Sequence, residues 1–217
     1  MLSGRPPTTQ PGIDQLLDRL VSGSSRQKRS TASALEKVSE QLPEKAEEAL
    51  KSYSRDGDDW GAGWILQILQ RHQPAALEAI PGVSGGWFHA PSSLDIDYTH
   101  LQQALLREHF EEADRLTSCA LRELAGEKAV QRGYVYFSEV PPMESLDLTT
   151  IDRLWVAYSQ GRFGFTVQAR LLSALGGRYE RLWPKIGWKN EGVWTRYPGS
   201  FLWSMDAPEG HMPLVNQ

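Results

Sequence analysis

The residues best suited to ligand chemistry lie in one stretch near the C-terminus, from Tyr179 to Pro213. Seven aromatic side chains fall within 25 residues there, and three basic side chains lie among them. They are Tyr179, Trp183, Trp188, Trp194, Tyr197, Phe201 and Trp203, with Lys185, Lys189 and Arg196. Glycines and prolines interrupt the stretch, which predicts a series of short turns rather than a long helix or strand. Such turns present large flat side chains, which suit a flat apolar ligand with some negative charge.

The charge along the chain is unevenly distributed. Residues 94–152 carry 12 acidic and 5 basic side chains, whereas residues 162–196 carry 7 basic and 2 acidic ones. The basic part coincides with the aromatic part, which indicates an anionic partner. The alternative is that the two segments pack together and neutralise each other through surface ion pairs, each worth about 0–1 kcal/mol. Both interpretations stay open.

The composition is that of an ordinary soluble globular protein. The 217 residues suffice for one large or two small domains, and the net charge of −4 gives no general attraction to nucleic acid. Cys119 is the single cysteine, so an internal disulfide is excluded and a reducing compartment is permitted. There is no apolar run of signal or transmembrane length. We therefore expect a soluble intracellular protein without a membrane span.

Patterns for metal binding and catalysis are missing from the sequence. The five histidines show no HxxxH or HExxH spacing, and one cysteine cannot form a zinc cluster. Cys119 is expected to be a small, buried or half-buried helix residue. The carboxylates Glu111, Glu112 and Asp114 are expected on a solvated helix face. Gly164 in GRFGF is expected at a tight turn, so we predict neither a metal site nor a catalytic site.

The first part of the chain predicts helices. Residues 1–12 hold three prolines and few apolar groups, which predicts a disordered tail. Residues 13–80 predict a small helical bundle or two stacked helical hairpins. Within them residues 22–30 are expected to be a connector, followed by a helix that carries Leu35, Val38 and Leu42.

Several residues of this part have the properties of helix ends or linkers. Pro43 and Pro74 suit the first turn of a helix, and Asp58 or Asp59 can cap one. Residues 81–93 are rich in Gly, Pro and Ser and predict a linker whose Trp87 and Phe88 dock onto a domain.

Residues 94–217 predict a second helical domain. Apolar steps of three and four from Phe110 to Leu124 indicate a helix that ends at Gly126. Residues 148–161 indicate another helix, with Thr149 or Thr150 as its cap. Thr166 is expected to cap a third helix, which stops at Gly176 and Gly177. The segment QRGYVYFSEVPP fits either an extended piece or a helical turn. The predicted fold class is all-α.

Three roles are open for the aromatic stretch. Bases of single-stranded nucleic acid stack on such rings beside cations, but the acidic remainder of the chain argues against this role. Some rings must pack in the core, and Trp155 and Trp183 are the first candidates. The third role is a cleft for a planar tetrapyrrole, whose propionates would pair with Arg or Lys.

Three runs of residues strongly resemble a known family. LDLTTIDRLWVAYSQGRFGFTVQ, LWPKIGWKNEGVWTRYP and FLWSMDAPEGHMPLVNQ resemble, in this order, the genomes-uncoupled tetrapyrrole-binding proteins, the fourth of that name. Members of this family are accessory factors of magnesium chelatase in cyanobacteria and chloroplasts. The resemblance covers about Leu94 to Gln217 and includes HFEEADRLT and YFSEV. Residues 13–80 resemble the appended domain of cyanobacterial members more loosely.

The resemblance implies a function without catalysis. It implies an all-helical core shaped like a cupped hand, which binds protoporphyrin IX or Mg-protoporphyrin IX in an apolar palm. It also implies stimulation of magnesium chelatase through its large porphyrin-binding subunit, by a monomer with no cofactor of its own. The expected location is the cyanobacterial cytoplasm, with partners holding the protein at the thylakoid periphery, or the chloroplast stroma. The alternative is a scaffold or signalling module of the same fold with weak or no porphyrin binding.

The matching motifs also imply the ligand-contacting residues. These are Phe137, Val140, Trp188, Trp194, Arg196, Tyr197, Phe201 and Trp203. Tyr197 stands where tryptophan is common in the family, which keeps a stacking ring and adds a hydroxyl. Relatives often continue past the position of Gln217 with an arginine-bearing segment, so a weaker affinity is expected here, with Asn216 as the last contact.

Overall fold

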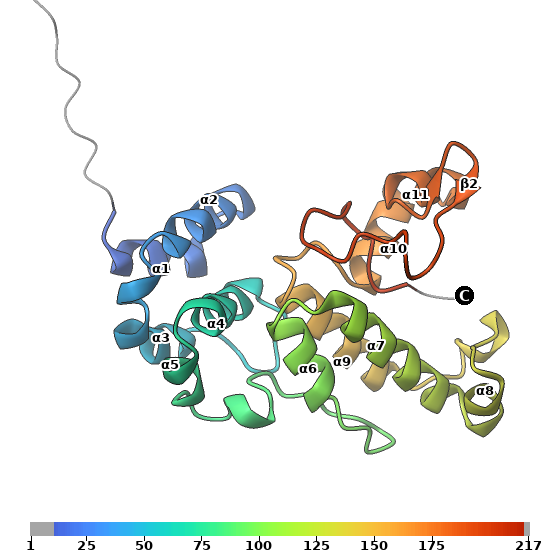
Figure 1. Cartoon of the computed structure of the whole chain (residues 1–217), viewed down its shortest axis with the longest axis horizontal. Coiled ribbons are helices and arrows are strands. Elements are labelled where there is room, and N and C mark those ends of the chain that lie inside the picture. The colour runs from blue at the N-terminus through green and yellow to red at the C-terminus, as the bar shows by residue number, and fades with distance from the viewer. Residues whose placement is uncertain (1–10, 215–217) are drawn as a thin grey trace, which may run out of the picture.

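The structure, a computed structural model, describes residues 11–214 and is built almost entirely of helices (Figure 1). This confirms the predicted all-α class. The only strands in residues 11–214 are β1 (Lys189–Asn190) and β2 (Val193–Trp194), which pair antiparallel with Lys189 opposite Trp194. The predicted tail at residues 1–12 lies outside the described residues except for Pro11 and Gly12.

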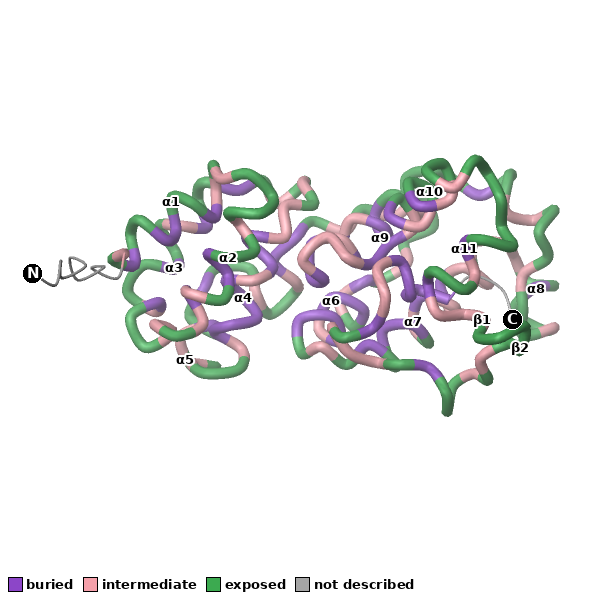
Figure 2. The backbone as a smooth tube through the Cα atoms, turned by 90° about the horizontal axis from the view of Figure 1, so that it is seen from above, coloured by how far each residue is buried: buried purple, intermediate pink, exposed green. Residues whose placement is uncertain are grey.

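Helices α1–α5 form one end of an elongated molecule, and the later helices form the other end (Figure 2). The elements of the first part are α1 (Ile13–Ser22), α2 (Ser25–Glu36), the 3₁₀ turn Ser39–Gln41, α3 (Pro43–Leu50), α4 (Trp60–His72) and α5 (Pro74–Glu78). After the 3₁₀ turn Val83–Gly85 the second part contains α6 (Thr99–Leu106), α7 (Phe110–Ala125), α8 (Glu127–Arg132), the 3₁₀ turn Phe137–Glu139, α9 (Ser145–Ala157), α10 (Phe165–Ala174) and α11 (Tyr179–Lys185).

Several local signals begin and end helices as the sequence predicts. The Asp59 carboxylate accepts a hydrogen bond from the Gly61 N–H (2.8 Å) and caps α4. Pro43 and Pro74 occupy first turns, where a missing N–H costs nothing. Gly126 ends α7 with a φ of 96°, which glycine adopts without steric penalty. The segment left open, QRGYVYFSEVPP, contains the end of α8 and a 3₁₀ turn.

The predicted connector at residues 22–30 is wrong, because α2 begins within it. The Ser24 hydroxyl accepts a hydrogen bond from the Gln27 N–H (3.4 Å), and Gln27 Oε1 accepts one from the Ser24 N–H (2.9 Å). This reciprocal capping box starts a helix that the serine-rich composition hid. The helix expected to carry Leu35, Val38 and Leu42 accordingly ends at Glu36.

The predicted caps of α9 and α10 are also wrong, because tertiary contacts replace them. α9 begins at Ser145, and Thr150 is buried, with its hydroxyl donating to the Pro91 carbonyl (2.8 Å). The Thr166 N–H at the start of α10 donates to the Asp152 carboxylate of α9 (2.9 Å). Gly164 makes the expected tight turn with a φ of 133°, and a Cβ there would lie 2.7 Å from the Asp152 carboxylate.

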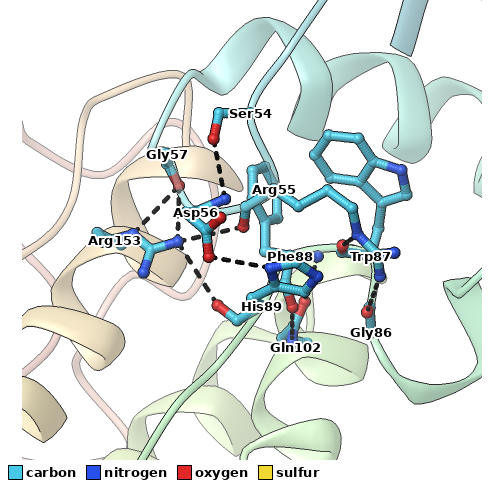
Figure 3. A network of polar contacts seen from close by, with 10 residues as sticks. All are labelled: Ser54, Arg55, Asp56, Gly57, Gly86, Trp87, Phe88, His89, Gln102 and Arg153. Carbon is cyan, nitrogen blue, oxygen red and sulfur yellow. Dashed lines mark hydrogen bonds and ion pairs between the residues drawn. The ribbon is translucent and has the colours of Figure 1, made fainter. Parts of the chain in front are cut away.

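The segment 81–93 docks as expected, since Trp87 and Phe88 are both buried. Arg153 of α9 reaches across it and donates to the carbonyls of Arg55 (3.2 Å) and Gly57 (3.1 Å), as Figure 3 shows. One continuous cluster of buried side chains runs from α1 through α4 to α9. The division into domains 13–80 and 94–217 stays a prediction.

Candidate functional site

A pocket of about 240 Å³ opens beside α7 in the second part of the chain. Its lining comes from α7, the segment after α8 and the C-terminal loops. The lining residues are Asp114, Arg115, Ser118, Leu121, Arg122, Gly133, Tyr134, Val135, Tyr197 and Leu214. The pocket therefore combines two arginines, one acid and two tyrosine rings, which is the chemistry that an anionic aromatic ligand requires.

Helix α7 supplies the floor of the pocket. Asp114, Ser118, Leu121 and Arg122 are spaced by four, three and one residues, so they share one face of the helix. The adjoining face carries Phe110, Ala113, Thr117 and Ala120, which are buried in the core. Burial of that face fixes the rotation of α7 and presents the first set to the pocket.

The two guanidinium groups of the floor are held in place by neighbours. Arg122 donates to the Gly133 carbonyl (3.3 Å) and contacts the Cys119 sulfur (3.0 Å). Arg115 makes a bidentate ion pair with Glu112, with both N–O distances at 2.7 Å. Cys119 is half-buried, as expected. Both arginines keep donors in reach of an anion, although an anion at Arg115 must compete with Glu112.

Asp114 is buried, so its expected place on a solvated helix face is wrong. Its side chain is 1% exposed, and one carboxylate oxygen accepts a hydrogen bond from the Leu214 N–H (2.6 Å). The other oxygen, Oδ2, has no hydrogen-bond partner within the described residues. Burial raises the pKa of Asp114 to about 6, against the opposing effects of the Leu214 N–H and the Tyr197 hydroxyl.

One rim of the pocket is the segment that follows α8. The Tyr134 and Tyr136 rings meet edge to face at 5.2 Å, and the Arg132 guanidinium lies 4.7 Å and 4.0 Å from their centres. The next residue, Phe137, is 79% exposed. Val140, the residue directly after the 3₁₀ turn Phe137–Glu139, is half-buried. This rim therefore offers exposed aromatic surface beside the pocket.

The other rim is a cluster of rings from the C-terminal loops. Tyr197 packs against Phe201 and Trp203, each at 5.8 Å, and Phe201 stacks on Trp203 at 5.5 Å. His211 lies 4.9 Å from Phe201. Burial lowers the pKa of His211, and its Nδ1–H donates to the Ile186 carbonyl (2.6 Å). This histidine is neutral support for the ring cluster rather than a charged group.

A separate group of rings lies on α11 and the β ribbon. Trp183 and Trp194 are 4.8 Å apart, and the Lys189 ammonium lies 5.1 Å from the Trp194 ring. Trp183 is half-buried, so its predicted place in the core is wrong, whereas Trp155 is fully buried as expected. Trp183 faces outward because α11 buries Leu182 instead.

The structure places seven of the eight expected ligand residues with described positions in three separate groups. Tyr197, Phe201 and Trp203 form one cluster, and Trp188 joins it through a hydrogen bond to the His211 carbonyl (2.8 Å). Phe137 and Val140 belong to the rim after α8, and Trp194 belongs to the group on α11. Arg196 is exposed next to Tyr197. Asn216 lies outside the described residues.

Sequence reasoning missed most of the pocket lining. Among the expected ligand residues only Tyr197 lines the pocket, whereas Asp114, Arg115 and Arg122 were not assigned to it. Their spacing on one face of a helix was visible in the sequence. The pattern alone did not reveal that the C-terminal loops would cover this face and bury one of its acids.

A second hollow, of about 640 Å³, lies around Arg55 and Gln102, where the segment 81–93 packs against its neighbours. Its polar side chains are engaged with the backbone. Arg55 donates to the carbonyls of Trp87 and Gly86, and Gln102 donates to the Phe88 carbonyl (2.8 Å). These hydrogen bonds hold the segment 81–93 in place (Figure 3). Within residues 11–214 no cluster of His, Cys, Asp or Glu suits a metal ion.

The sequence is similar to several known proteins. A family model described as GUN4-like matches residues 91–217. A Ycf53-like protein from Synechocystis is 52% identical over 153 residues, which cover 70% of this chain and 61% of the relative. The chloroplastic tetrapyrrole-binding protein of Arabidopsis thaliana is 35% identical over 54% of this chain and 47% of the relative.

A solved structure gives the same result. The structure of GUN4 from Chlamydomonas reinhardtii superposes with a TM-score of 0.56 at 38% identity, covering 59% of this chain and 83% of that chain. The matched part spans about half to three-fifths of the length of the curated relatives. Within the described residues no helix has the length and apolar character of a membrane span.

Proposed function

The chain belongs to the GUN4-like family, and from this premise we propose that it is a porphyrin-binding regulatory protein. Its ligands are protoporphyrin IX and Mg-protoporphyrin IX, and its effect is to stimulate magnesium chelatase. The Arabidopsis relative is named a tetrapyrrole-binding protein, which supports the ligand class. The observation that carries the proposal is a pocket with two arginines on its floor and aromatic rings on both rims.

The chemistry of the pocket fits the proposed ligand. A porphyrin offers wide apolar faces and two carboxylates on one edge. Arg115 and Arg122 can pair with the carboxylates, because a guanidinium recognises a carboxylate with two parallel hydrogen bonds. The rings of Tyr134 and Tyr197 can pack on the faces of the macrocycle.

The residue roles extend beyond the pocket lining. We assign contact with the macrocycle to the eight residues that the family motifs imply and to two added ones. They are Phe137, Val140, Trp188, Trp194, Arg196, Tyr197, Phe201 and Trp203, together with Tyr134 and Leu214. Asn216 is proposed as a further contact beyond the described residues. The exposed rings of Phe137 and Trp194 would be covered by ligand, which gives a reason for their exposure.

The size of the pocket predicts how the ligand is held. Sites for drug-sized ligands measure about 300–1,000 Å³, and the present cavity of about 240 Å³ is smaller. Binding therefore requires the rims to separate or the macrocycle to remain partly outside. A partly exposed macrocycle suits delivery to another protein. The partner proposed here is the large porphyrin-binding subunit of the chelatase, with this chain acting as a monomer.

The proposed action involves no bond making by this chain. The rings exclude water from the macrocycle, the arginines neutralise its carboxylates, and the partner takes the ligand or returns it. We propose that the protein acts where tetrapyrroles are made, in a cyanobacterial cytoplasm or a chloroplast stroma.

Titration with protoporphyrin IX tests this proposal. We expect saturable shifts in porphyrin absorbance and quenching of tryptophan fluorescence at micromolar concentrations. Arg122→Gln should weaken binding roughly tenfold or more, since hydrogen bonds to charged groups contribute about 1.5–3 kcal/mol. Arg107→Gln, an exposed arginine outside the pocket, is the matched control and should leave the affinity unchanged.

The alternative function is a scaffold that acts through protein contacts. Co-purification with the chelatase large subunit, with and without porphyrin, separates the two functions. Absence of saturable porphyrin binding, together with partner binding that ignores porphyrin, would replace the proposed function with the scaffold.

A further inference from the structure

We propose that His211 is a positioning residue for the ligand site. Its imidazole, in the neutral Nδ1–H form, ties the loop of residues 198–203, here called the ring loop, to the end of α11. It thereby sets the place of the Phe201 and Trp203 rings without touching the ligand or its metal ion. This inference rests on the proposed porphyrin binding and adds a residue to that same site.

The first support is that every polar group of His211 has a partner, although the residue is only 2% exposed. Its N–H donates to the Pro208 carbonyl (3.0 Å), and its carbonyl accepts from the Trp188 indole (2.8 Å). On the ring, Nδ1 lies 2.6 Å from the Ile186 carbonyl and Nε2 lies 3.3 Å from the Leu202 nitrogen. One buried residue therefore joins segments that carry or flank the proposed ligand residues.

The second support is that these partners fix the protonation state of the ring. The Ile186 carbonyl can only accept a hydrogen bond, so Nδ1 carries the proton. The Leu202 N–H can only donate one, so Nε2 carries none. The neutral Nδ1–H tautomer is the single form that satisfies both. Burial, which outweighs the bond to Ile186, lowers the pKa of His211 and agrees with a neutral ring.

The third support is the way the ring loop is attached. Among the described residues, the other hydrogen bonds of residues 198–203 end within the loop or at Arg196. The Leu202 N–H is thus the donor that ties the loop to another segment. The imidazole also lies 4.9 Å from the Phe201 ring, which stacks on Trp203 at 5.5 Å. Without the hydrogen bond these rings would be placed by packing alone, which is less directional.

The end of α11 leaves room for the imidazole. Gly187 follows Ile186 with a φ of 77°, and a Cβ there would lie 3.1 Å from Nδ1 of His211. That distance is shorter than an ordinary van der Waals contact. The missing side chain therefore allows the close approach that the bond between Nδ1 and the Ile186 carbonyl requires.

The same geometry argues against His211 as a ligand of a porphyrin-bound metal ion. A metal ligand must offer a nitrogen lone pair, and in the Nδ1–H tautomer only Nε2 has one. That lone pair accepts the Leu202 N–H. His211 should therefore support metal-free and magnesium porphyrins equally, through the rings that it holds.

Two substitutions separate the two ring bonds. His211→Asn keeps an amide near Nδ1 and can still donate to Ile186, whereas His211→Gln keeps one near Nε2 and can still accept from Leu202. Each variant loses one hydrogen bond, so both should lower the thermal unfolding midpoint to a similar extent. Protoporphyrin IX affinity should fall roughly threefold to tenfold in His211→Asn and stay within about twofold of wild type in His211→Gln. His100→Asn, at an exposed histidine of α6, is the matched control.

Two further measurements do not depend on that difference. Nitrogen NMR of ¹⁵N-labelled wild type at about pH 7 should show a protonated Nδ1 and a bare Nε2 for His211, whereas a free histidine prefers the opposite tautomer. Titration with Mg-protoporphyrin IX should give each variant the same fold-change as titration with protoporphyrin IX.

Several results would overturn the positioning role while porphyrin binding stands. They are an Nε2–H or charged ring in the NMR spectrum, equal loss of affinity in both variants, or unchanged affinity in both. A loss confined to Mg-protoporphyrin IX would show metal ligation and would also overturn it. Absence of saturable binding by wild type would overturn the proposed function itself, and the positioning role with it, even if the Nδ1–H tautomer is found.

Discussion

Phe110 packs against both Trp155 and Phe163 in the core, whereas Trp183 and Trp194 pack together at the surface beside Lys189. Both groups have similar distances between ring centres, 6.1 and 5.6 Å in the core and 4.8 Å at the surface. They differ in what surrounds them. The core rings are at most 1% exposed, but Trp194 is 53% exposed.

This difference separates rings that stabilise the fold from rings that are free to bind. Burial of an aromatic side chain stabilises a domain by removing its surface from water. An exposed pair beside a cation gains little from folding, so its free energy is available for a ligand. The ring cluster of Tyr197, Phe201 and Trp203 is intermediate, because Phe201 is buried while its neighbours are half-exposed.

The largest expected effect is in the core. Trp155→Ala should lower the free energy of unfolding by about 3–5 kcal/mol, as large core truncations do. It also removes the indole N–H that donates to the Thr117 hydroxyl (2.9 Å). Urea denaturation followed by circular dichroism measures this loss. A loss of stability no larger than that of a surface substitution would contradict the distinction between core rings and surface rings.

Phe201→Ala should have a smaller, mixed effect. Phe201 is 8% exposed and contacts Tyr197, Trp203 and His211. We expect a stability loss of about 2–3 kcal/mol, below the full core value because this cluster is at the rim. Porphyrin affinity should fall as well. Thermal unfolding and porphyrin titration on the same sample check both; unchanged stability would place Phe201 with the exposed rings.

Asp114→Asn should change stability in a pH-dependent way. The pKa of Asp114 is about 6 in the folded protein against 3.8 for a free side chain, so folding takes up a proton. That contribution is complete below pH 3.8 and is lost as the pH rises through 6. Asparagine does not ionise, so Asp114→Asn avoids this loss of stability and should be more stable than wild type by up to about 3 kcal/mol at about pH 8.

Denaturation of wild type and Asp114→Asn across this pH range tests the sign of the stability difference. The stability difference should shrink toward the acidic end of the range. A difference that grows on acidification would mean that the folded-state pKa of Asp114 is lowered instead.

The smallest expected effect on stability is at the surface rings. Trp194→Ala should change the free energy of unfolding by no more than about 0.5 kcal/mol, because the side chain is half exposed. It should nevertheless weaken porphyrin binding about tenfold, since stacked rings contribute about 1–3 kcal/mol per partner. Val193→Ala, at an exposed neighbour on the same ribbon, is the control for the fold. Weakened binding by both variants would indicate that the ribbon's conformation matters more than the indole.

The helical class and most helix ends follow from local rules. Asp59 caps α4 and Gly126 ends α7 because the deciding contacts lie within a few residues. Neither Thr150 nor Thr166 caps a helix, because each forms a hydrogen bond to a residue that is distant along the chain. Thr150 donates to Pro91, and the N–H of Thr166 donates to Asp152. A rule based on spacing contains no information about such partners.

By itself the sequence determined the all-helical class, the family and the presence of an aromatic, basic stretch. These properties depend on residue type and spacing along the chain. Only the tertiary structure decided that Trp183 lies outside the core, that Arg115 and Arg122 lie in the pocket floor, and that Asp114 is buried. The reason is physical: exposure and charge state depend on what covers a side chain. For Asp114 that cover is Leu214, one hundred residues away.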